Sequence, residues 1–299
     1  MIHANRLSKR YGDHVVLREL DLQVGRSERV AILGLNGAGK TTLFRCLLGL
    51  TGFEGDLQVG GFHAGPHGRE ARRQIGYVPQ QPPRFDLTLD RFIDLFSALR
   101  GGSASDVRER LDGLGLSVAE HGRKSLRDLS GGMLQKAVLG IALGAEAPVL
   151  LLDEPTANLD AGSRREFLAA LGRIDPATTL LFASHRLSDV EALADRLLVL
   201  SEGTFVYDGR PGHLWRLAGG IELRLMVPAD HVDSLARMLE SRPGVSFVRA
   251  DGTGVLVRVE DGRELDLLVN VREHGIPLLD FRTHPPALEE VMAHLSEAE

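Results

Sequence analysis

A glycine-rich segment that could bind phosphate occupies residues 34 to 42. It matches G-x-x-x-x-G-K-[ST] in full, and its residues are Gly34, Leu35, Asn36, Gly37, Ala38, Gly39, Lys40 and Thr41, followed by Thr42. Backbone N–H groups and the start of a helix attract phosphate oxygens. Lys40 is predicted to reach the β and γ phosphates, and Thr41 to hold Mg²⁺. A glycine turn that merely contains a lysine is the alternative, but the preceding strand-like Val30 to Leu33 favours phosphate binding.

A second candidate is a pair of carboxylates, Asp153 and Glu154, which follow the apolar run from Val149 to Leu152. A strand that ends in acids places charge at the carboxyl edge of a parallel sheet, where α/β proteins bind ligands. Asp153 is predicted to orient Mg²⁺ through water, and Glu154 to act as general base toward a water molecule. Adjacent acids also serve as helix caps. Together with the phosphate loop, the pair predicts hydrolysis of a nucleoside triphosphate.

Over residues 1 to about 217 the sequence resembles the nucleotide-binding domain of ABC-type ATPases. The further motif that carries this resemblance is Leu129-Ser130-Gly131-Gly132, shortly before the acidic pair. The resemblance implies that Ser130, Gly131 and Gly132 contact the γ-phosphate of ATP held by a second copy of the chain. Met133 stands where glutamine is usual, and methionine also occurs there in the exporter-like branch. Since serine hydroxyl, glycine N–H groups and helix dipole do the binding, we expect the change to be tolerated.

The resemblance assigns roles to four more residues. Gln80 corresponds to the glutamine that senses Mg²⁺ and meets the membrane subunit, although neighbouring Gln81 is an alternative. His185 corresponds to the switch histidine at the γ-phosphate, and Asp160 to the loop that couples the two sites across the dimer. Tyr11 stands where the family stacks an aromatic ring on adenine. Glu154, His185, Gln80 and Lys40 are thus the predicted catalytic residues, and Thr41, Gln80 and Asp153 the predicted Mg²⁺ site.

Composition limits the function further. The 299 residues carry a net charge of -6, which argues against nucleic-acid binding through a basic surface. The one cysteine, Cys46, is expected to be a buried structural thiol. An apolar run long enough to span a membrane, about 18 residues, is not found: Glu146 and Pro148 interrupt the longest candidate. We therefore expect a cytoplasmic protein that meets the membrane only through a partner.

The spacing of apolar runs predicts an α/β fold. Unbroken runs suit parallel strands covered on both faces, and they occupy Val30 to Leu33, Ile75 to Val78, Val149 to Asp153, Thr179 to Ala183 and Leu197 to Leu200. Residues from about 88 to 147 contain no such run and are predicted to form a helical insertion. Together with this α/β pattern, the resemblance implies a P-loop NTPase core of the ABC ATPase type over residues 1–217.

Residues 221–299 are predicted to form a small second domain. Strand-like and helix-like segments alternate in the order β-α-β-β-α-β, the ferredoxin-like arrangement. They run from Ile221 to Val227, Ala229 to Ser241, Val245 to Ala250, Val255 to Glu260, Arg263 to His274 and Pro277 to Thr283. A last helix is expected from Ala287 to Ala298.

The resemblance implies an ATP- and Mg²⁺-dependent ATPase that works as a homodimer and energises a separate transmembrane permease. Soluble ABC ATPases of translation carry two cassettes and a charged linker, and those of DNA repair carry long coiled coils; this chain shows neither. The ending Pro286-Ala287-Leu288-Glu289-Glu290 resembles the tails of exporter-type subunits, which favours export. The cargo is selected by the permease, so the sequence does not identify it.

Overall fold

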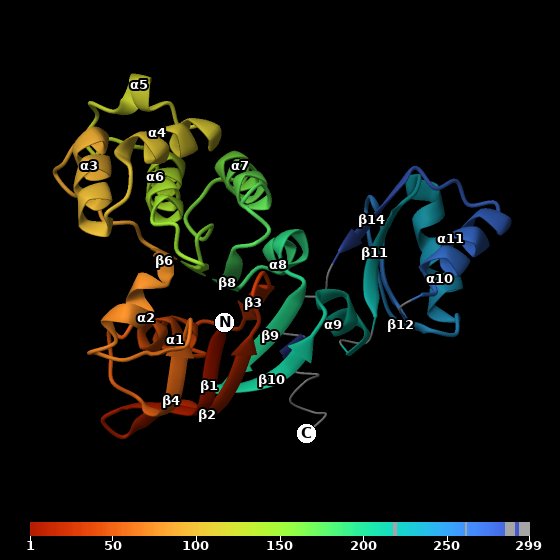
Figure 1. Cartoon of the computed structure of the whole chain (residues 1–299). Helices are drawn as coiled ribbons and strands as arrows, with labels where there is room; N and C mark the ends of the chain where they lie inside the picture. Colours follow the sequence, from red (N-terminus) through yellow and green to blue (C-terminus); the bar gives the residue numbers. More distant parts are fainter. Residues whose placement is uncertain (218–219, 261, 285–290, 293–299) are drawn as a thin grey trace. The chain divides into compact units, whose positions relative to one another are not determined.

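The computed structural model describes residues 1–217, 220–260, 262–284 and 291–292, which fall into two compact units (Figure 1). Unit 1 is Met1–Asp208 and unit 2 is Gly209–Glu299. This division lies nearer the N-terminus than the expected boundary at residue 217, and it assigns helix α9 (Pro211–Leu217) to unit 2. The exporter-like ending at 286–290 lies outside the described residues. So does the expected last helix, except for residues 291 and 292, which are helical.

A six-stranded sheet forms the centre of unit 1, in the order β10-β9-β3-β8-β7-β6. Its strands are β3 (Arg29–Leu33), β6 (Ile75–Val78), β7 (Val149–Asp153), β8 (Thr179–Ser184), β9 (Arg196–Ser201) and β10 (Thr204–Gly209). Strands β3, β6, β7, β8 and β9 pair in parallel. Every residue of β7 and β8 is buried, which confirms that unbroken apolar runs mark strands covered on both faces. The carboxyl ends of β3, β8, β7 and β6 therefore meet at one edge.

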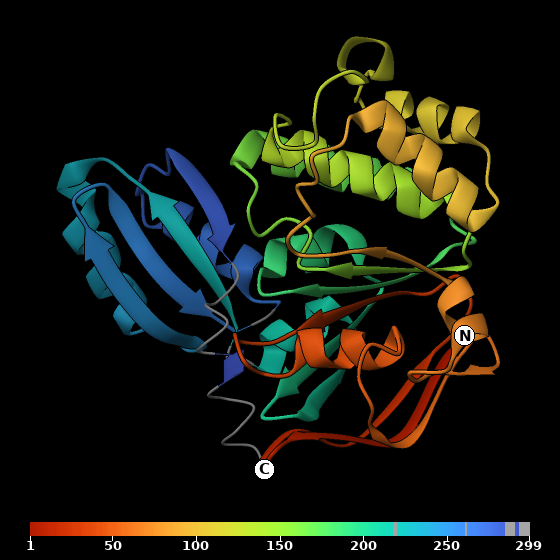
Figure 2. The same cartoon turned by 90° about the vertical axis from the view of Figure 1, so that its left-hand side faces the viewer.

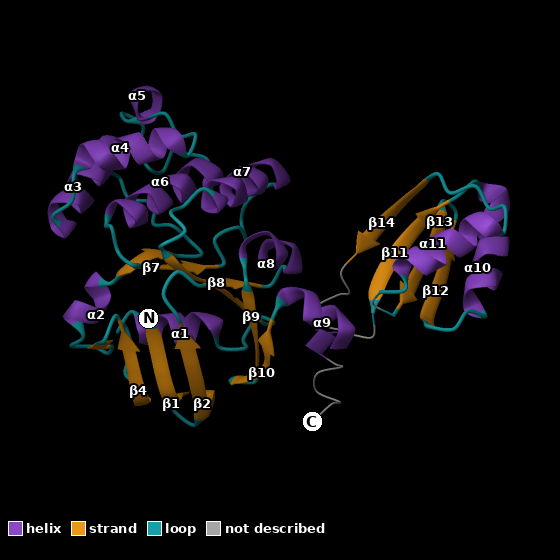
Figure 3. Cartoon of the chain, turned by 45° about the vertical axis from the view of Figure 1, so that its right-hand side comes forward, coloured by secondary structure: helices purple, strands orange, loops and turns teal. Residues whose placement is uncertain are grey.

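A second, antiparallel sheet was not predicted from the sequence. It has the order β2-β1-β4-β5 and consists of β1 (Ile2–Tyr11), β2 (His14–Val24), β4 (Glu54–Val59) and β5 (Phe62–His63). Helix α1 (Lys40–Leu47) lies between the two sheets (Figure 3). Its buried face, with Phe44 and Cys46, joins both sheets in one core. Burial raises the pKa of the Cys46 thiol to about 11, so this cysteine stays protonated at neutral pH.

The predicted helical insertion is confirmed. Figure 2 shows these helices as a cluster over one side of the parallel sheet, namely α3 (Leu89–Arg100), α4 (Ala104–Gly113), α5 (Val118–His121) and α6 (Gly131–Gly144). Each begins after a serine or threonine whose side chain accepts a backbone N–H bond, which stabilises a helix start. Between residues 88 and 147 the only pairing of strand type is an isolated bridge. Unit 1 also contains α2 (Arg69–Arg73), α7 (Ala161–Gly172) and α8 (Leu187–Leu193).

Unit 2 has the predicted β-α-β-β-α-β order. Its elements are β11 (Ile221–Met226), α10 (Val232–Glu240), β12 (Val245–Asp251), β13 (Gly254–Val259), α11 (Glu264–Glu273) and β14 (Asp280–His284), with a short 3₁₀ turn at Ala229–His231. The four strands form an antiparallel sheet in the order β12-β13-β11-β14. Leu223, Leu225, Val255 and Val257 are fully buried on the face that packs against both helices. The ferredoxin-like expectation is therefore confirmed.

Candidate active site

The phosphate loop runs from Gly34 to Gly39, between the end of β3 and the start of α1. Gly37 and Gly39 have φ angles of 87° and 111°, a region that side chains rarely tolerate. A Cβ atom on Gly34 would lie 2.5 Å from the Leu200 carbonyl oxygen. Conformation and space thus both require glycine here, and the loop leaves its N–H groups at the start of α1, where anions bind.

A cavity of about 250 Å³ opens beside this loop. It is lined by Val16, Asn36, Gly37, Gly39, Lys40, Thr41, Thr42, Gln80 and Glu154. The structure therefore brings most of the predicted phosphate loop together with one predicted acid and the predicted glutamine. Gly34, Leu35 and Ala38 shape the loop without lining the cavity. Val16 was not predicted, because it reaches the cavity from β2, in the sheet that the sequence did not reveal.

Lys40 is buried and has three oxygen partners. Its Nζ atom donates to the carbonyl oxygens of Gly34 at 2.7 Å and Leu35 at 3.1 Å, and it lies 3.1 Å from Glu154 Oε1. Lys40 is 5% exposed and Glu154 7% exposed. A buried charge requires partners of this kind, because removal from water costs it several kcal/mol. The ammonium group is therefore held against the phosphate loop, and Lys40 lines the cavity.

Glu154 is the residue on which the predicted catalytic side chains converge. Its Oε2 atom lies 2.9 Å from His185 Nδ1 and accepts a hydrogen bond of 3.4 Å from Gln80 Nε2. The backbone of Glu154 has a φ angle of 43°. This conformation is uncommon for residues other than glycine, and where it occurs it is often at a functional site. Its N–H donates to the Ala183 carbonyl at 3.1 Å, which holds it there. The carboxylate thus contacts Lys40, Gln80 and His185 at once.

Asp153 precedes Glu154 in the chain, and its carboxylate interacts with the hydroxyl groups of Thr41 and Tyr77. The Thr41 hydroxyl donates to Asp153 Oδ1 at 3.3 Å. Burial raises the pKa of the Asp153 carboxyl, and the bond from Thr41 opposes this rise. Burial and the Asp153 charge also raise the pKa of the Tyr77 hydroxyl, so this group stays protonated at neutral pH. Hydroxyl, carboxylate and amide oxygens are the ligands that Mg²⁺ prefers, so Thr41, Asp153 and Gln80 fit this ion.

Asp153→Asn is expected to stabilise the fold in the absence of metal. Because the folded pKa of Asp153 is raised, its contribution to stability is present below the unfolded pKa and is lost as pH rises through the folded pKa. At pH 7 the amide should raise the Tm by roughly 2–4 °C, the shift that about 1 kcal/mol produces in a domain of this size. Calorimetry at pH 7 without Mg²⁺ measures this. An unchanged or lower Tm would mean that the buried Asp153 charge does not destabilise the fold.

The predicted signature and coupling residues lie at two helix starts that touch each other. Ser130 caps α6 by accepting the Met133 N–H at 3.2 Å. Asp160 caps α7, and hydrogen bonds from Ser163 and Gly162 lower the pKa of its carboxyl. A Cβ atom on Gly132 would lie 2.9 Å from Ser163 Oγ. Ser130, Gly131, Gly132 and Asp160 do not line the cavity at Lys40.

Tyr11 is not brought into the cavity either. It lies at the end of β1, is 45% exposed, and has the Lys9 ammonium group 4.6 Å from its ring centre. Stacking on adenine stays a prediction. Gln81, the alternative to Gln80, does not line the cavity.

The parallel sheet, the phosphate loop at its edge and the helical insertion that begins α6 with Ser130 define unit 1 as a P-loop ATPase fold of the cassette class. A family described as "ABC transporter" matches residues 17–157. A Nod factor export ATP-binding protein of Ralstonia nicotianae is 32% identical over 98% of this chain and 92% of its own length. A daunorubicin resistance ATP-binding protein of Streptomyces coeruleorubidus is 32% identical over 96% and 93%.

The chain therefore belongs to the family of ABC transporter ATP-binding proteins, as the motifs indicated. A solved structure described as the ATP-binding subunit of an ABC transporter superposes with a TM-score of 0.66, at 27% identity, over 73% of this chain and 93% of that one. Proteins of this family bind and hydrolyse ATP. In the part of the chain that the structure describes, no helix combines the length and apolarity needed to cross a membrane.

Proposed function

We propose that this chain hydrolyses ATP with Mg²⁺ as the energising subunit of an exporter, bound to a separate transmembrane permease. The observation that carries the proposal is the convergence on Glu154, whose carboxylate lies 3.1 Å from Lys40 and 2.9 Å from His185 at the phosphate loop. A general base must stand within reach of the proton that it removes. A water molecule between Glu154 and a phosphate bound by this loop would satisfy that requirement.

Each residue has a distinct task in the proposed reaction. Lys40 exchanges its contact with Glu154 for the β and γ phosphates, because an oxygen anion of the substrate replaces the carboxylate as its partner. Glu154, freed from Lys40, accepts the proton of the attacking water. His185 and Gln80 orient Glu154 and the γ-phosphate. Thr41, Asp153 and Gln80 would hold Mg²⁺, whose charge would offset that of the phosphates.

The proposed active unit is a dimer of two copies. Ser130 and Gly132 are positioned at the start of α6 yet do not line the cavity of their own chain. If the signature helix of a second copy faces the cavity, its serine hydroxyl, N–H groups and dipole complete the γ-phosphate shell. Asp160, which caps the neighbouring α7, then lies in position to couple the two sites.

The transport role rests on the relatives. Those at 32% identity are named for Nod factor export and daunorubicin resistance, and they match nearly the whole chain, unit 2 included. These names support the proposal that the protein lies on the cytoplasmic face of the membrane, attached through its permease. The chemistry of the cargo depends on that permease.

Co-purification with a polytopic membrane protein tests this role. We expect a tagged copy, extracted from membranes in mild detergent, to retain a protein with several transmembrane helices in stoichiometric amount, and that partner to change the rate of phosphate release. The Lys40→Ala variant should retain the partner and lose hydrolysis, because Lys40 serves the nucleotide. A chain that hydrolyses ATP at full rate and is recovered without a membrane protein would instead be a soluble ABC ATPase.

A further inference from the structure

A buried carboxylate outside the cavity, that of Asp189, has both of its oxygens occupied by donors. Asp189 lies in the first turn of α8 and is 2% exposed. Its Oδ2 accepts the Thr156 hydroxyl at 2.5 Å. Its Oδ1 accepts Arg164 Nε at 2.7 Å and also contacts the second nitrogen of that guanidinium group. Charge-assisted bonds of this kind are strong and directional.

The three members of this cluster come from three segments, and each segment carries a predicted site residue. Thr156 stands two residues after Glu154, with Pro155 between them. Asp189 stands four residues after His185, and Arg164 stands four residues after Asp160, on α7. One carboxylate therefore ties the loop after β7 and the start of α8 to the helix that Asp160 caps.

Side-chain bonds matter for the loop after β7 and the start of α8, because the backbone pairing of β7 with β8 ends just before them. The pairing of β7 with β8 ends with Asp153 opposite Ala183, and one further backbone bond joins Glu154 N–H to Ala183. Beyond that point the 2.9 Å contact between Glu154 and His185 depends on the relative position of two loops. The hydrogen bond from Thr156 to Asp189 joins the same two segments further along the chain.

We propose that Asp189, with Thr156 and Arg164, is a positioning cluster that holds Glu154 against His185 and links both to Asp160. This inference rests on the proposed ATPase function. None of the three side chains lines the cavity or contacts Lys40. The cluster should therefore affect the placement of the base and leave the binding of the phosphates unchanged.

Thr156→Val and Asp189→Asn separate positioning from binding. Valine keeps the shape of threonine but removes the donor, so we expect kcat to fall about 10-fold, equal to about 1.4 kcal/mol of barrier. Asparagine also removes the charge that pairs with Arg164, and we expect a fall of roughly 100-fold. The KM for ATP should stay within about 2-fold of wild type, since a loss confined to the transition state leaves ground-state binding intact.

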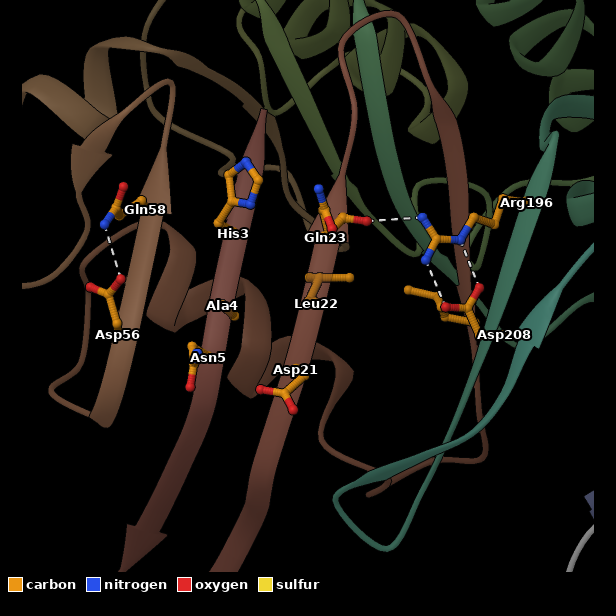
Figure 4. A pocket seen from close by; sticks show the side chains of 11 residues that line it. His3, Ala4, Asn5, Asp21, Leu22, Gln23, Asp56, Gln58, Arg196 and Asp208 are labelled. Carbon is orange, nitrogen blue, oxygen red and sulfur yellow. Dashed lines mark hydrogen bonds and ion pairs between the residues drawn. The ribbon is translucent and has the colours of Figure 1, made fainter.

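The matched control is Asp208→Asn. Asp208 also accepts a two-nitrogen contact from an arginine, Arg196, at 2.7 and 2.6 Å. That pair lies at a separate polar depression of unit 1, where Figure 4 shows it beside Gln23. This control also removes the charge of a carboxylate that pairs with an arginine, and it should keep both kcat and KM.

Hydrogen exchange supplies a readout that does not need turnover. In the nucleotide-free protein, amides of residues 184–189 should exchange faster in Thr156→Val and Asp189→Asn than in wild type, and at the wild-type rate in Asp208→Asn. If Asp189→Asn does not fold, Thr156→Val decides alone. Unchanged kcat and exchange, or a fall in kcat matched by an equal rise in KM, would overturn the cluster's role. A wild-type chain without ATPase activity would contradict the proposed function instead, and exchange would still test the link.

Discussion

Replacing Glu154 by glutamine is expected to lower the rate of phosphate release from ATP at least about 100-fold, the contribution of a positioned general base. The amide keeps the shape of the side chain but cannot accept the proton of the attacking water. ATP binding should persist, because the phosphate loop is unchanged. It should even become tighter, since Lys40 loses the carboxylate that lies 3.1 Å from its ammonium group. Single-turnover phosphate release and a fluorescent-nucleotide titration measure the two effects.

Glu166→Gln is the matched control for this experiment. Glu166 lies on α7 and is also paired with a lysine, Lys136, at 2.8 Å. It does not line the cavity, so its amide variant should hydrolyse ATP at the wild-type rate. A Glu154→Gln protein that stays within a few-fold of wild type would show that another group removes the proton.

Mixing two inactive variants should restore activity if a second copy completes the site. Lys40→Ala cannot bind the phosphates, and Ser130→Ala cannot complete the γ-phosphate shell of its partner. In a mixed dimer one site keeps both an intact Lys40 and an intact Ser130. With random pairing and independent sites, an equal mixture should therefore recover up to roughly a quarter of wild-type activity. Phosphate release from each variant alone and from the mixture measures this.

The single variants set the baseline of that experiment, and each should be nearly inactive. A double variant that carries both changes in one chain, mixed with wild type, checks the pairing. Its mixed dimers hold no intact site, so they should add nothing to the activity of the wild-type homodimers that remain. Ser130→Ala that remains fully active alone, or a mixture that never exceeds its parts, would contradict the shared site.

The sequence predicted the parallel sheet and most of the site because their signals are local. Val149 to Asp153 is an unbroken apolar run that ends in charge, which marks a strand buried on both faces. Gly34, Asp153 and His185 each follow such a run. Parallel order then places them at one edge of the sheet, and the structure brings Lys40, Gln80, Glu154 and His185 together around one carboxylate.

The antiparallel sheet and the Asp189 cluster were not predictable in this way. The ladders that β1 forms with β2 and β4 contain several register shifts, so no clean alternation of apolar and polar residues runs through the strand. Val16 reaches the cavity only through this sheet. Thr156, Arg164 and Asp189 are polar residues near helix starts, where caps are common. Only the folded structure shows that Thr156 and Arg164 both donate to the carboxylate of Asp189.

The most direct test of the account is the size of the Glu154→Gln protein with and without Mg·ATP, measured by sedimentation velocity over a range of concentrations. We expect a monomer without nucleotide and a stable dimer with it, because two triphosphates would each be enclosed by residues of both chains. Adding Ser130→Ala should weaken that dimer. If the nucleotide-loaded protein stays monomeric at high concentration, with or without its membrane partner, each chain encloses its own ATP, and the central claim is wrong.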